Sequence, residues 1–143
     1  MAACCEGNED HHTQGGTVIY GIGIDLVEMG RTARLLKKYG ERFAKRVLTQ
    51  LERREFTASR QPAAFLAQSF AAKEAFAKAV GSGFRYPVIL SYISVAHDSL
   101  GKPELHFHPE LERYLKEHNI GRHHLSLSDE NNLACAMVIL ERS

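Results

Sequence analysis

The chain contains 143 residues, of which 44% are hydrophobic and 24% are charged. A chain of this length suits one domain, and the composition excludes a disordered protein, a collagen-like repeat and a disulfide-dense mini-protein. The 18 basic and 17 acidic side chains give a net charge of +1, which favours neither nucleic acid nor an anionic membrane as a partner.

Cysteine content and hydropathy indicate the compartment. The three cysteines, Cys4, Cys5 and Cys135, include no CxxC pair, and their odd number leaves one unpaired. This pattern is typical of a reducing compartment and of a protein without structural zinc. No apolar run approaches the roughly 18 residues of a membrane span, and no secretory signal is recognisable. We therefore expect a cytoplasmic protein that does not associate with membranes.

The first third of the chain predicts a tail, a strand and a helix. Residues 1–16 are polar and without periodicity, which predicts a disordered tail or an artificial remnant ahead of a single domain over 17–143. The β-branched, apolar run over 17–25 predicts a buried strand, in which Gly21 and Gly23 suggest close approach of another backbone. The apolar period then becomes helical from about Leu26, and Gly40 is a typical C-cap.

Helix and turn signals order the rest of the chain. Thr49 and Glu52 form a capping box before a short helix, and Pro62 opens a longer, Ala-rich helix that stops at Gly81. A short helix is expected over 109–118. Further strands are expected over 92–96, 104–108, 124–128 and 133–140, the last two as a hairpin. This order predicts an α+β domain with a mainly antiparallel sheet packed against helices.

Basic side chains concentrate in one stretch. Residues 31–60 hold ten Lys or Arg and three acids, Glu41, Glu52 and Glu55, so the stretch carries +7 and the remainder −6. The basic residues are Arg31, Arg34, Lys37, Lys38, Arg42, Lys45, Arg46, Arg53, Arg54 and Arg60. Such a surface usually faces only water, and its functional alternative is to bind an acidic partner.

Four charged residues have the chemistry to bind a metal ion and phosphate groups. Asp25 ends the first predicted strand. Glu74 lies in the middle of the long helix, one turn before Lys78 and beside Lys73. Mg²⁺ is commonly held by one or two carboxylates and by substrate phosphate oxygens. The structural alternatives are Asp25 as a helix N-cap and Glu74 with Lys78 as a solvent-facing ion pair.

Two later segments carry further polar groups. The Gly-Lys-Pro turn over 101–103 offers backbone amides and one cation, although most such turns have no other role. His124, Ser126 and Ser128 share one face of a predicted strand, and such faces are usually just solvated. They do not predict a Ser-His-Asp triad, because neighbours on one strand seldom form one. The common nucleotide-binding fingerprints are absent.

Five sequence blocks are similar to a known family. They read GIGIDLVE at 21–28, FAKRVLT at 43–49, FLAQSFAAKEAFAKA at 65–79, LGKP at 100–103 and HLSLS at 124–128. In this order they resemble the holo-acyl-carrier-protein synthases, a family of 4′-phosphopantetheinyl transferases. The resemblance implies the 4′-phosphopantetheinyl transferase fold and Mg²⁺ as cofactor. It also implies a homotrimer whose active sites lie between subunits. It implies transfer of 4′-phosphopantetheine from coenzyme A to a serine of apo-acyl carrier protein in fatty acid biosynthesis, with release of adenosine 3′,5′-bisphosphate.

The resemblance also implies roles for individual residues. Asp25 and Glu74 match the metal-binding carboxylates, and Glu74 is our candidate for the general base. Arg31 and Arg42 match contacts with the carrier protein, which agrees with the basic stretch. Lys73 and Lys78 match basic residues near the phosphates of coenzyme A. The nucleotide pocket, which the neighbouring subunit completes, is matched by Gly101, Lys102, Pro103 and His124.

One position departs from the family pattern, and two other functions stay open. Ser69 stands where many members have arginine, so one phosphate contact is missing unless Lys45, Arg46 or Lys102 replaces it. A different Mg²⁺-dependent enzyme acting on a nucleotide phosphate would need the carboxylates and lysines but not the basic stretch. A non-enzymatic binder of an acidic protein would need only the basic stretch.

Overall fold

The computed structural model of the protein describes residues 16 and 18–143, so the tail predicted over 1–16 lies, except for Gly16, outside the described residues. The elements are β1 (Ile19–Glu28), α1 (Met29–Tyr39), α2 (Glu41–Val47), α3 (Gln50–Ala58), α4 (Pro62–Val80), the 3-10 helix η1 (Leu90–Tyr92), β2 (Ile93–His97), β3 (Pro103–Phe107), α5 (Pro109–Glu117), β4 (Ile120–Glu130) and β5 (Leu133–Arg142). Helices combined with antiparallel strands confirm the α+β prediction. Among the described residues, no helix has the length and hydrophobicity that crossing a membrane requires.

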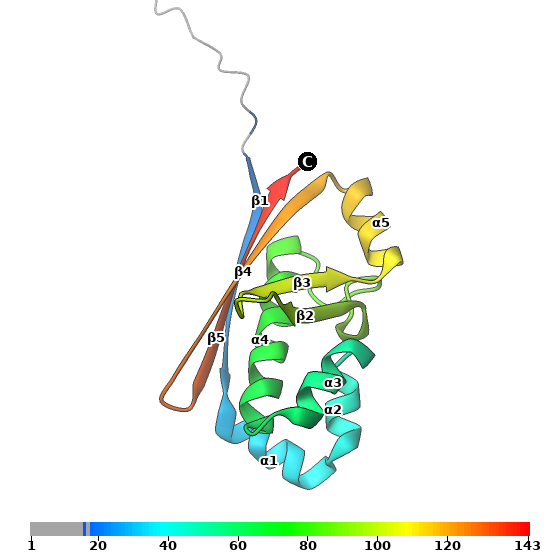
Figure 1. The fold of residues 1–143 in the computed structure, drawn as a ribbon. Coiled ribbons are helices and arrows are strands. Elements are labelled where there is room, and N and C mark those ends of the chain that lie inside the picture. The colour runs from blue at the N-terminus through cyan, green and yellow to red at the C-terminus, as the bar shows by residue number, and fades with distance from the viewer. Residues whose placement is uncertain (1–15, 17) are drawn as a thin grey trace, which may run out of the picture.

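The strands form two antiparallel sheets. In the larger sheet the order is β1-β5-β4, so the first and last strands of the chain pair with each other, while β2 and β3 form a separate hairpin. Helix α4 runs along one face of the larger sheet, and α1, α2 and α3 gather at one end of the molecule (Figure 1). The opposite face of the sheet is uncovered in the single chain, where Ile22, Ile24 and Leu26 are exposed.

Two glycines let α4 lie directly on β1. A Cβ atom added at Gly21 would fall on the carbonyl oxygen of Ala79, and one added at Gly23 would fall on that of Ala75. Because no side chain fits there, glycine is required at both positions. The predicted close approach of another backbone is confirmed, and it brings the middle of α4 next to the residues that follow in β1.

Strand β1 is longer than the sequence pattern predicts. Its pairing with β5 continues to Glu28, opposite Leu133, and α1 begins only at Met29. The predictions of a helix from about Leu26 and of Asp25 as its N-cap are therefore wrong. The hydrogen bonds of the ladder with β5 override the helical spacing of the apolar residues at this point.

The boundary signals of α3 and α4 are confirmed. The Thr49 amide donates to Glu52 Oε1 at 2.9 Å and the Glu52 amide donates to Thr49 Oγ1 at 3.4 Å, which together make the capping box. Pro62 lies in the first turn of α4, and Gly81 ends the helix with a φ of 88°. This left-handed conformation favours glycine.

Helix α2 was not predicted, and it anchors the basic stretch. Its residues Ala44 and Val47, with Leu48 directly after it, are buried against Leu66 of α4 in a second hydrophobic cluster. The charged residues of α2 therefore lie on a helix that is packed against α4 rather than on a loop.

Candidate active site

Asp25, Glu74 and Lys78 lie where β1 meets α4. Strand alternation puts Asp25 on the same face as Gly23, which α4 covers. The Lys78 ammonium donates to Asp25 Oδ1 at 3.1 Å and to the carbonyl oxygen of Ile24 at 3.0 Å. Lys78 thus pairs with Asp25 across the two elements. The solvent-facing Glu74–Lys78 pair considered from the sequence is replaced by this contact.

The two carboxylates influence each other electrostatically. Partial burial raises the pKa of Glu74, the charge of Asp25 raises it further, and the charge of Lys78 opposes both. Among the described residues, no group of three or more His, Cys, Asp or Glu side chains is placed to hold a metal ion. A cation at this pair would need further oxygen ligands from water or substrate, as is usual for Mg²⁺. The pair therefore fits Mg²⁺ better than a metal that needs a complete cage of protein ligands.

A pocket of about 580 Å³ opens beside these residues. Asp25, Glu74, Lys78 and Arg31 supply most of its charged lining. The apolar lining comes from five elements and consists of Leu26, Val27, Leu35, Phe43, Leu66, Phe70 and Leu133. We call this cavity the carboxylate pocket. The sequence did not reveal its apolar wall, because the residues are distant in the chain and each also fits an ordinary core position.

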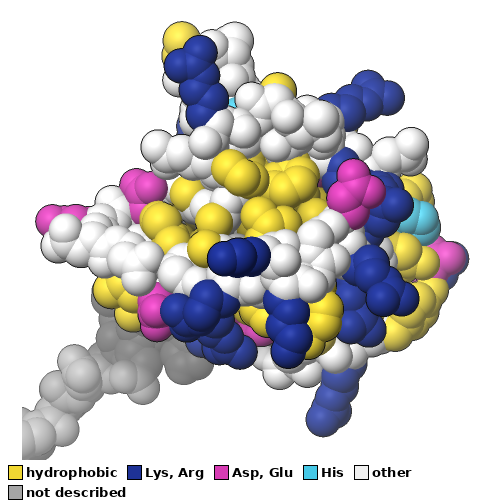
Figure 2. All heavy atoms as spheres, turned by 90° about the horizontal axis from the view of Figure 1, so that it is seen from below, with side chains coloured by type: hydrophobic (Ala, Val, Ile, Leu, Met, Phe, Trp, Pro, Cys, Tyr) yellow, Lys and Arg dark blue, Asp and Glu magenta, His cyan; other side chains and the backbone are white. Residues whose placement is uncertain are grey.

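The basic stretch lies around this end of the molecule. Arg31 lines the carboxylate pocket from α1, whereas Arg42 is exposed in the first turn of α2 and is not part of the lining. Figure 2 looks onto the end that carries α1 and α2, where hydrophobic side chains gather centrally and Lys and Arg side chains surround them. Glu52, one of the three acids of the stretch, is buried, which makes the exposed surface still more basic.

Lys102, Pro103 and His124 line a second cavity, of about 520 Å³, between β3 and β4. Gly101 precedes them in the turn with a φ of 85°, a conformation that favours glycine. His124 Nε2 lies 3.1 Å from Glu141 Oε2 on the neighbouring strand β5. We call this cavity the histidine pocket.

The histidine pocket also contains His106 and His123, which the sequence analysis did not select. His123 Nε2 lies 3.0 Å from the carbonyl oxygen of Leu105, and its ring packs edge-on against Phe107 with centroids 4.9 Å apart. Burial lowers the pKa of His123, which favours the neutral ring. The alternation used for His124 assigns His123 to the opposite face, so only the packing of β3 against β4 reveals its place in this pocket.

The structure does not unite the predicted site residues within one chain. None of the described residues lines both pockets. The carboxylate pocket borders β1 and the histidine pocket borders β4, which are the two edge strands of the larger sheet. Within one chain, the two groups of predicted site residues therefore lie in separate pockets.

Lys73 lies outside both pockets. Its ammonium is fully buried and lies 2.6 Å from Glu52 Oε1, so the prediction that Lys73 binds coenzyme A phosphates is wrong. Ser69 is also buried and donates to the other carboxylate oxygen of Glu52. In this chain Ser69 therefore belongs to the buried contacts of Glu52.

Comparison with known proteins identifies the family. The model of the 4′-phosphopantetheinyl transferase superfamily matches residues 21–138. The holo-[acyl-carrier-protein] synthase of Nitrosospira multiformis is 63% identical over 125 residues, which cover 87% of this chain and 100% of that protein. The chain belongs to the 4′-phosphopantetheinyl transferase superfamily, and the resemblance drawn from the five sequence blocks is confirmed.

Solved structures of holo-[acyl-carrier-protein] synthases have the same fold. The crystal structure of the enzyme from Neisseria meningitidis has a TM-score of 0.84 at 49% identity, and the match covers 87% of this chain and 99% of that one. The enzyme from Bacillus anthracis, in complex with coenzyme A (3′,5′-ADP), has a TM-score of 0.75 at 36% identity, with 89% and 100% covered. Within the superfamily, these synthases are similar to the chain over almost their whole length.

Proposed function

We propose that this protein is a holo-[acyl-carrier-protein] synthase that transfers 4′-phosphopantetheine from coenzyme A to a serine of apo-acyl carrier protein. The observation that carries the proposal is the meeting of Asp25, Glu74 and Lys78 at a pocket that Arg31 of the basic stretch also lines, in a chain of this family. The relative in complex with coenzyme A supports coenzyme A as the donor. A role in fatty acid biosynthesis and the cytoplasmic location expected from the sequence belong to the same proposal.

The reaction is a displacement at phosphorus. The serine oxygen forms a bond to one phosphorus of the coenzyme A pyrophosphate, and the bond from that phosphorus to the oxygen of the departing adenosine 3′,5′-bisphosphate breaks. Positioning and charge neutralisation dominate such reactions. When bound, Mg²⁺ supplies charge neutralisation at the pyrophosphate, and Asp25 and Glu74 would hold it. Lys78 adds a positive charge, and Glu74 is the proposed acceptor of the serine proton, directly or through water.

A homotrimer with shared sites is part of the proposal. On the uncovered face of the sheet, Ile22, Ile24 and Leu26 are 63%, 57% and 62% exposed. Met137 on β5 lies opposite Ile24 and is 41% exposed, so the apolar surface continues across two strands. A contiguous apolar surface of this kind is typical of a subunit interface.

The positions of the two pockets support a head-to-tail arrangement. Such an arrangement brings the β1 edge of one subunit towards the β4 edge of the next, and a closed ring repeats this contact at every interface. The carboxylates Asp25 and Glu74 of one subunit would then share a site with Lys102 and His124 of its neighbour. The number three comes from the resemblance to the short, trimeric members of the family.

Reversing the charge of Arg31 should weaken the use of carrier protein selectively. Arg31 is exposed at the start of α1, so Arg31→Glu opposes an acidic partner and should raise the apparent KM for the carrier about tenfold, mainly by slowing association. The effect should shrink at high salt, because exposed charges are screened beyond about 10 Å at 0.1 M. Steady-state kinetics at several salt concentrations measure both effects.

The matched control is Arg113→Glu, which reverses an exposed arginine on α5, away from the basic stretch. It should leave the KM for the carrier unchanged. An equal loss of coenzyme A affinity in Arg31→Glu would instead assign Arg31 to the phosphates of the donor.

The test of the proposed function is whether product release depends on the carrier. With coenzyme A and Mg²⁺, adenosine 3′,5′-bisphosphate should appear only when apo-acyl carrier protein is present. Release without any carrier would favour a Mg²⁺-dependent hydrolase of nucleotide phosphates. Carrier binding with neither release nor Mg²⁺-dependent binding of coenzyme A would favour a non-enzymatic binder.

A further inference from the structure

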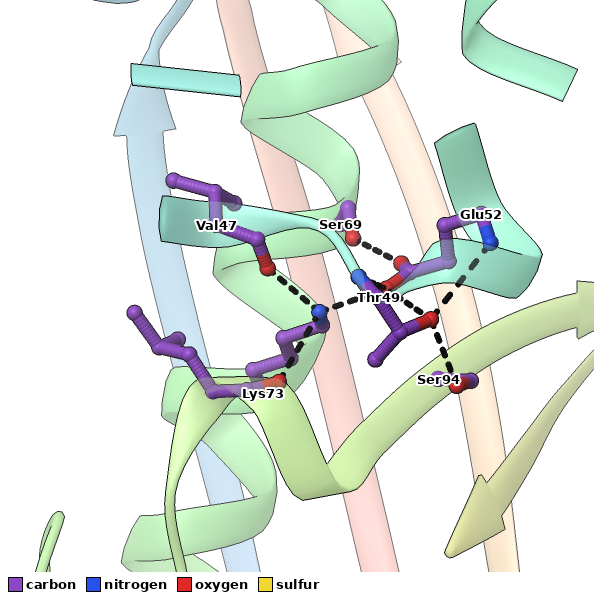
Figure 3. Close-up of polar contacts among 7 residues, drawn as sticks. Val47, Thr49, Glu52, Ser69, Lys73 and Ser94 are labelled. Carbon is purple, nitrogen blue, oxygen red and sulfur yellow. Dashed lines mark hydrogen bonds and ion pairs between the residues drawn. The ribbon is translucent and has the colours of Figure 1, made fainter. Parts of the chain in front are cut away.

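Lys73 is a fully buried charge to which the proposed mechanism gives no role. Its ammonium donates to Glu52 Oε1 at 2.6 Å, to the carbonyl oxygen of Val47, the last residue of α2, at 2.5 Å, and to that of Leu90 in η1 at 3.2 Å (Figure 3). An ammonium group has three donors, so all of them are used. These contacts fix the otherwise flexible lysine side chain in one place.

Glu52 extends this network to further elements. Its Oε1 also accepts from the Thr49 amide at 2.9 Å, and its Oε2 accepts from Ser69 of α4. Thr49 Oγ1 lies 2.7 Å from Ser94 Oγ of β2. Through these bonds, which Figure 3 shows converging on Glu52 and Thr49, α4 is tied to the end of α2, to the start of α3 and to β2.

The network and the carboxylate pocket use neighbouring faces of the same helix. Ser69 and Lys73 are four residues apart and contact Glu52, while Phe70 and Glu74 are also four apart and line the pocket. Adjacent residues of an α-helix differ by about 100° around the axis. Any rotation or slide of α4 that moves the Lys73 side chain therefore moves Glu74 with it.

The same ammonium also fixes a second wall of the pocket. Helix α2 ends at Val47, whose carbonyl oxygen accepts from Lys73, and one turn earlier it contributes Phe43 to the lining. Ala75 and Ala79 of α4 pack closely on Gly23 and Gly21 of β1, but this contact fixes only the sheet side of the helix. On the side of α2 and α3, the directional, charge-assisted hydrogen bonds of Lys73 fix the position of α4.

We infer that Lys73 is a positioning residue: held by Glu52 and by the carbonyl groups of α2 and η1, it sets the rotation of α4 that presents Glu74 to Asp25. It acts through Glu74 and touches neither substrate nor metal. The inference rests on the proposed function, in which Asp25 and Glu74 bind a divalent cation together. Supporting residues of this kind typically change metal affinity or activity by about ten- to a hundredfold.

The decisive variant combines Lys73→Met with Glu52→Gln. Lys73→Met alone leaves the Glu52 carboxylate buried and unpaired, which should lower the stability measured by urea unfolding. The double variant contains no unpaired charge, and Gln retains the capping box with Thr49. It should therefore recover most of that stability. Ser69→Ala is the matched control, because it removes one bond to Glu52 and leaves all three contacts of Lys73.

Binding of Mn²⁺, followed by the electron paramagnetic resonance of the free ion, reports on the carboxylate pair without any need for activity. The double variant should bind Mn²⁺ about ten- to a hundredfold more weakly than the wild-type protein, with a comparable fall in kcat, although its stability is largely restored. Ser69→Ala should retain the Mn²⁺ affinity and kcat of the wild type.

Three outcomes would overturn the inference. A double variant with restored stability and wild-type Mn²⁺ affinity would show that the pair only maintains the fold. If neither Lys73→Met nor the double variant folds, the conclusion is also that the pair only maintains the fold. A wild-type protein that does not bind Mn²⁺ would refute the inference and the proposed metal site together. If the wild type binds Mn²⁺ but transfers no phosphopantetheine, the proposed function fails alone, and the affinities still decide the role of Lys73.

Discussion

Removing either carboxylate of the pair should nearly abolish transfer while leaving the protein folded. Asp25→Ala and Glu74→Ala should each lower kcat at moderate Mg²⁺ by about a hundredfold or more, because the charge that develops on the pyrophosphate is then poorly compensated. Asp25→Ala also removes the ion-pair partner of Lys78. The measurements are transfer kinetics against Mg²⁺ concentration, with circular dichroism to verify the fold.

Glu74 should be the more sensitive of the two positions, because it is proposed both as ligand and as proton acceptor. Raising the Mg²⁺ concentration should therefore rescue Asp25→Ala more than Glu74→Ala. Glu117→Ala, which removes an exposed carboxylate at the end of α5, is the control and should be fully active. Near-normal turnover of either site variant at moderate Mg²⁺ would refute its assignment.

Mixing two inactive variants should restore activity if sites lie between subunits. Glu74→Ala disables the carboxylate half, and Lys102→Ala with His124→Ala disables the histidine half. In randomly mixed trimers, the carboxylate half of a site is intact with a probability of one half, and so is the histidine half from the neighbouring subunit. Roughly a quarter of the sites should therefore be complete. Activity should rise from almost none to about that fraction of the wild-type value.

Native mass spectrometry must first verify that mixed trimers have formed. No recovery from verified mixed trimers would show that each subunit holds a whole site. A fully active monomer at nanomolar concentration would refute the trimer itself. Unmixed samples of each variant, taken through the same dissociation and reassembly, provide the baseline.

The sequence predicted the elements whose signals are local. The capping box at Thr49, the proline that opens α4 and the glycine that ends it each act within one helical turn, and the structure has all three where expected. The contact of β1 with α4 was predicted in part. Gly21 and Gly23 indicated that another backbone lies close to β1, but not which element it belongs to.

The sequence failed where tertiary contacts decide the outcome. Helix α2 has seven residues and four charges, too short for a clear apolar period, and it owes its place to packing against Leu66. Lys73 was assigned to phosphates from its charge and its motif position. Its burial was missed because it depends on Glu52, which lies 21 residues earlier in the chain. Glu52 offered a weak signal for this contact. A capping box uses only part of the hydrogen-bonding capacity of a carboxylate, so a further donor was to be expected.

The mass of the carrier protein tests the central claim most directly. Apo-acyl carrier protein incubated with this protein, coenzyme A and Mg²⁺ should gain one phosphopantetheine group, and the gain should disappear when coenzyme A is omitted, when Mg²⁺ is chelated, or when the acceptor serine of the carrier is replaced by alanine. An unchanged carrier mass in the presence of folded, assembled protein and all substrates would contradict the assignment as a holo-[acyl-carrier-protein] synthase.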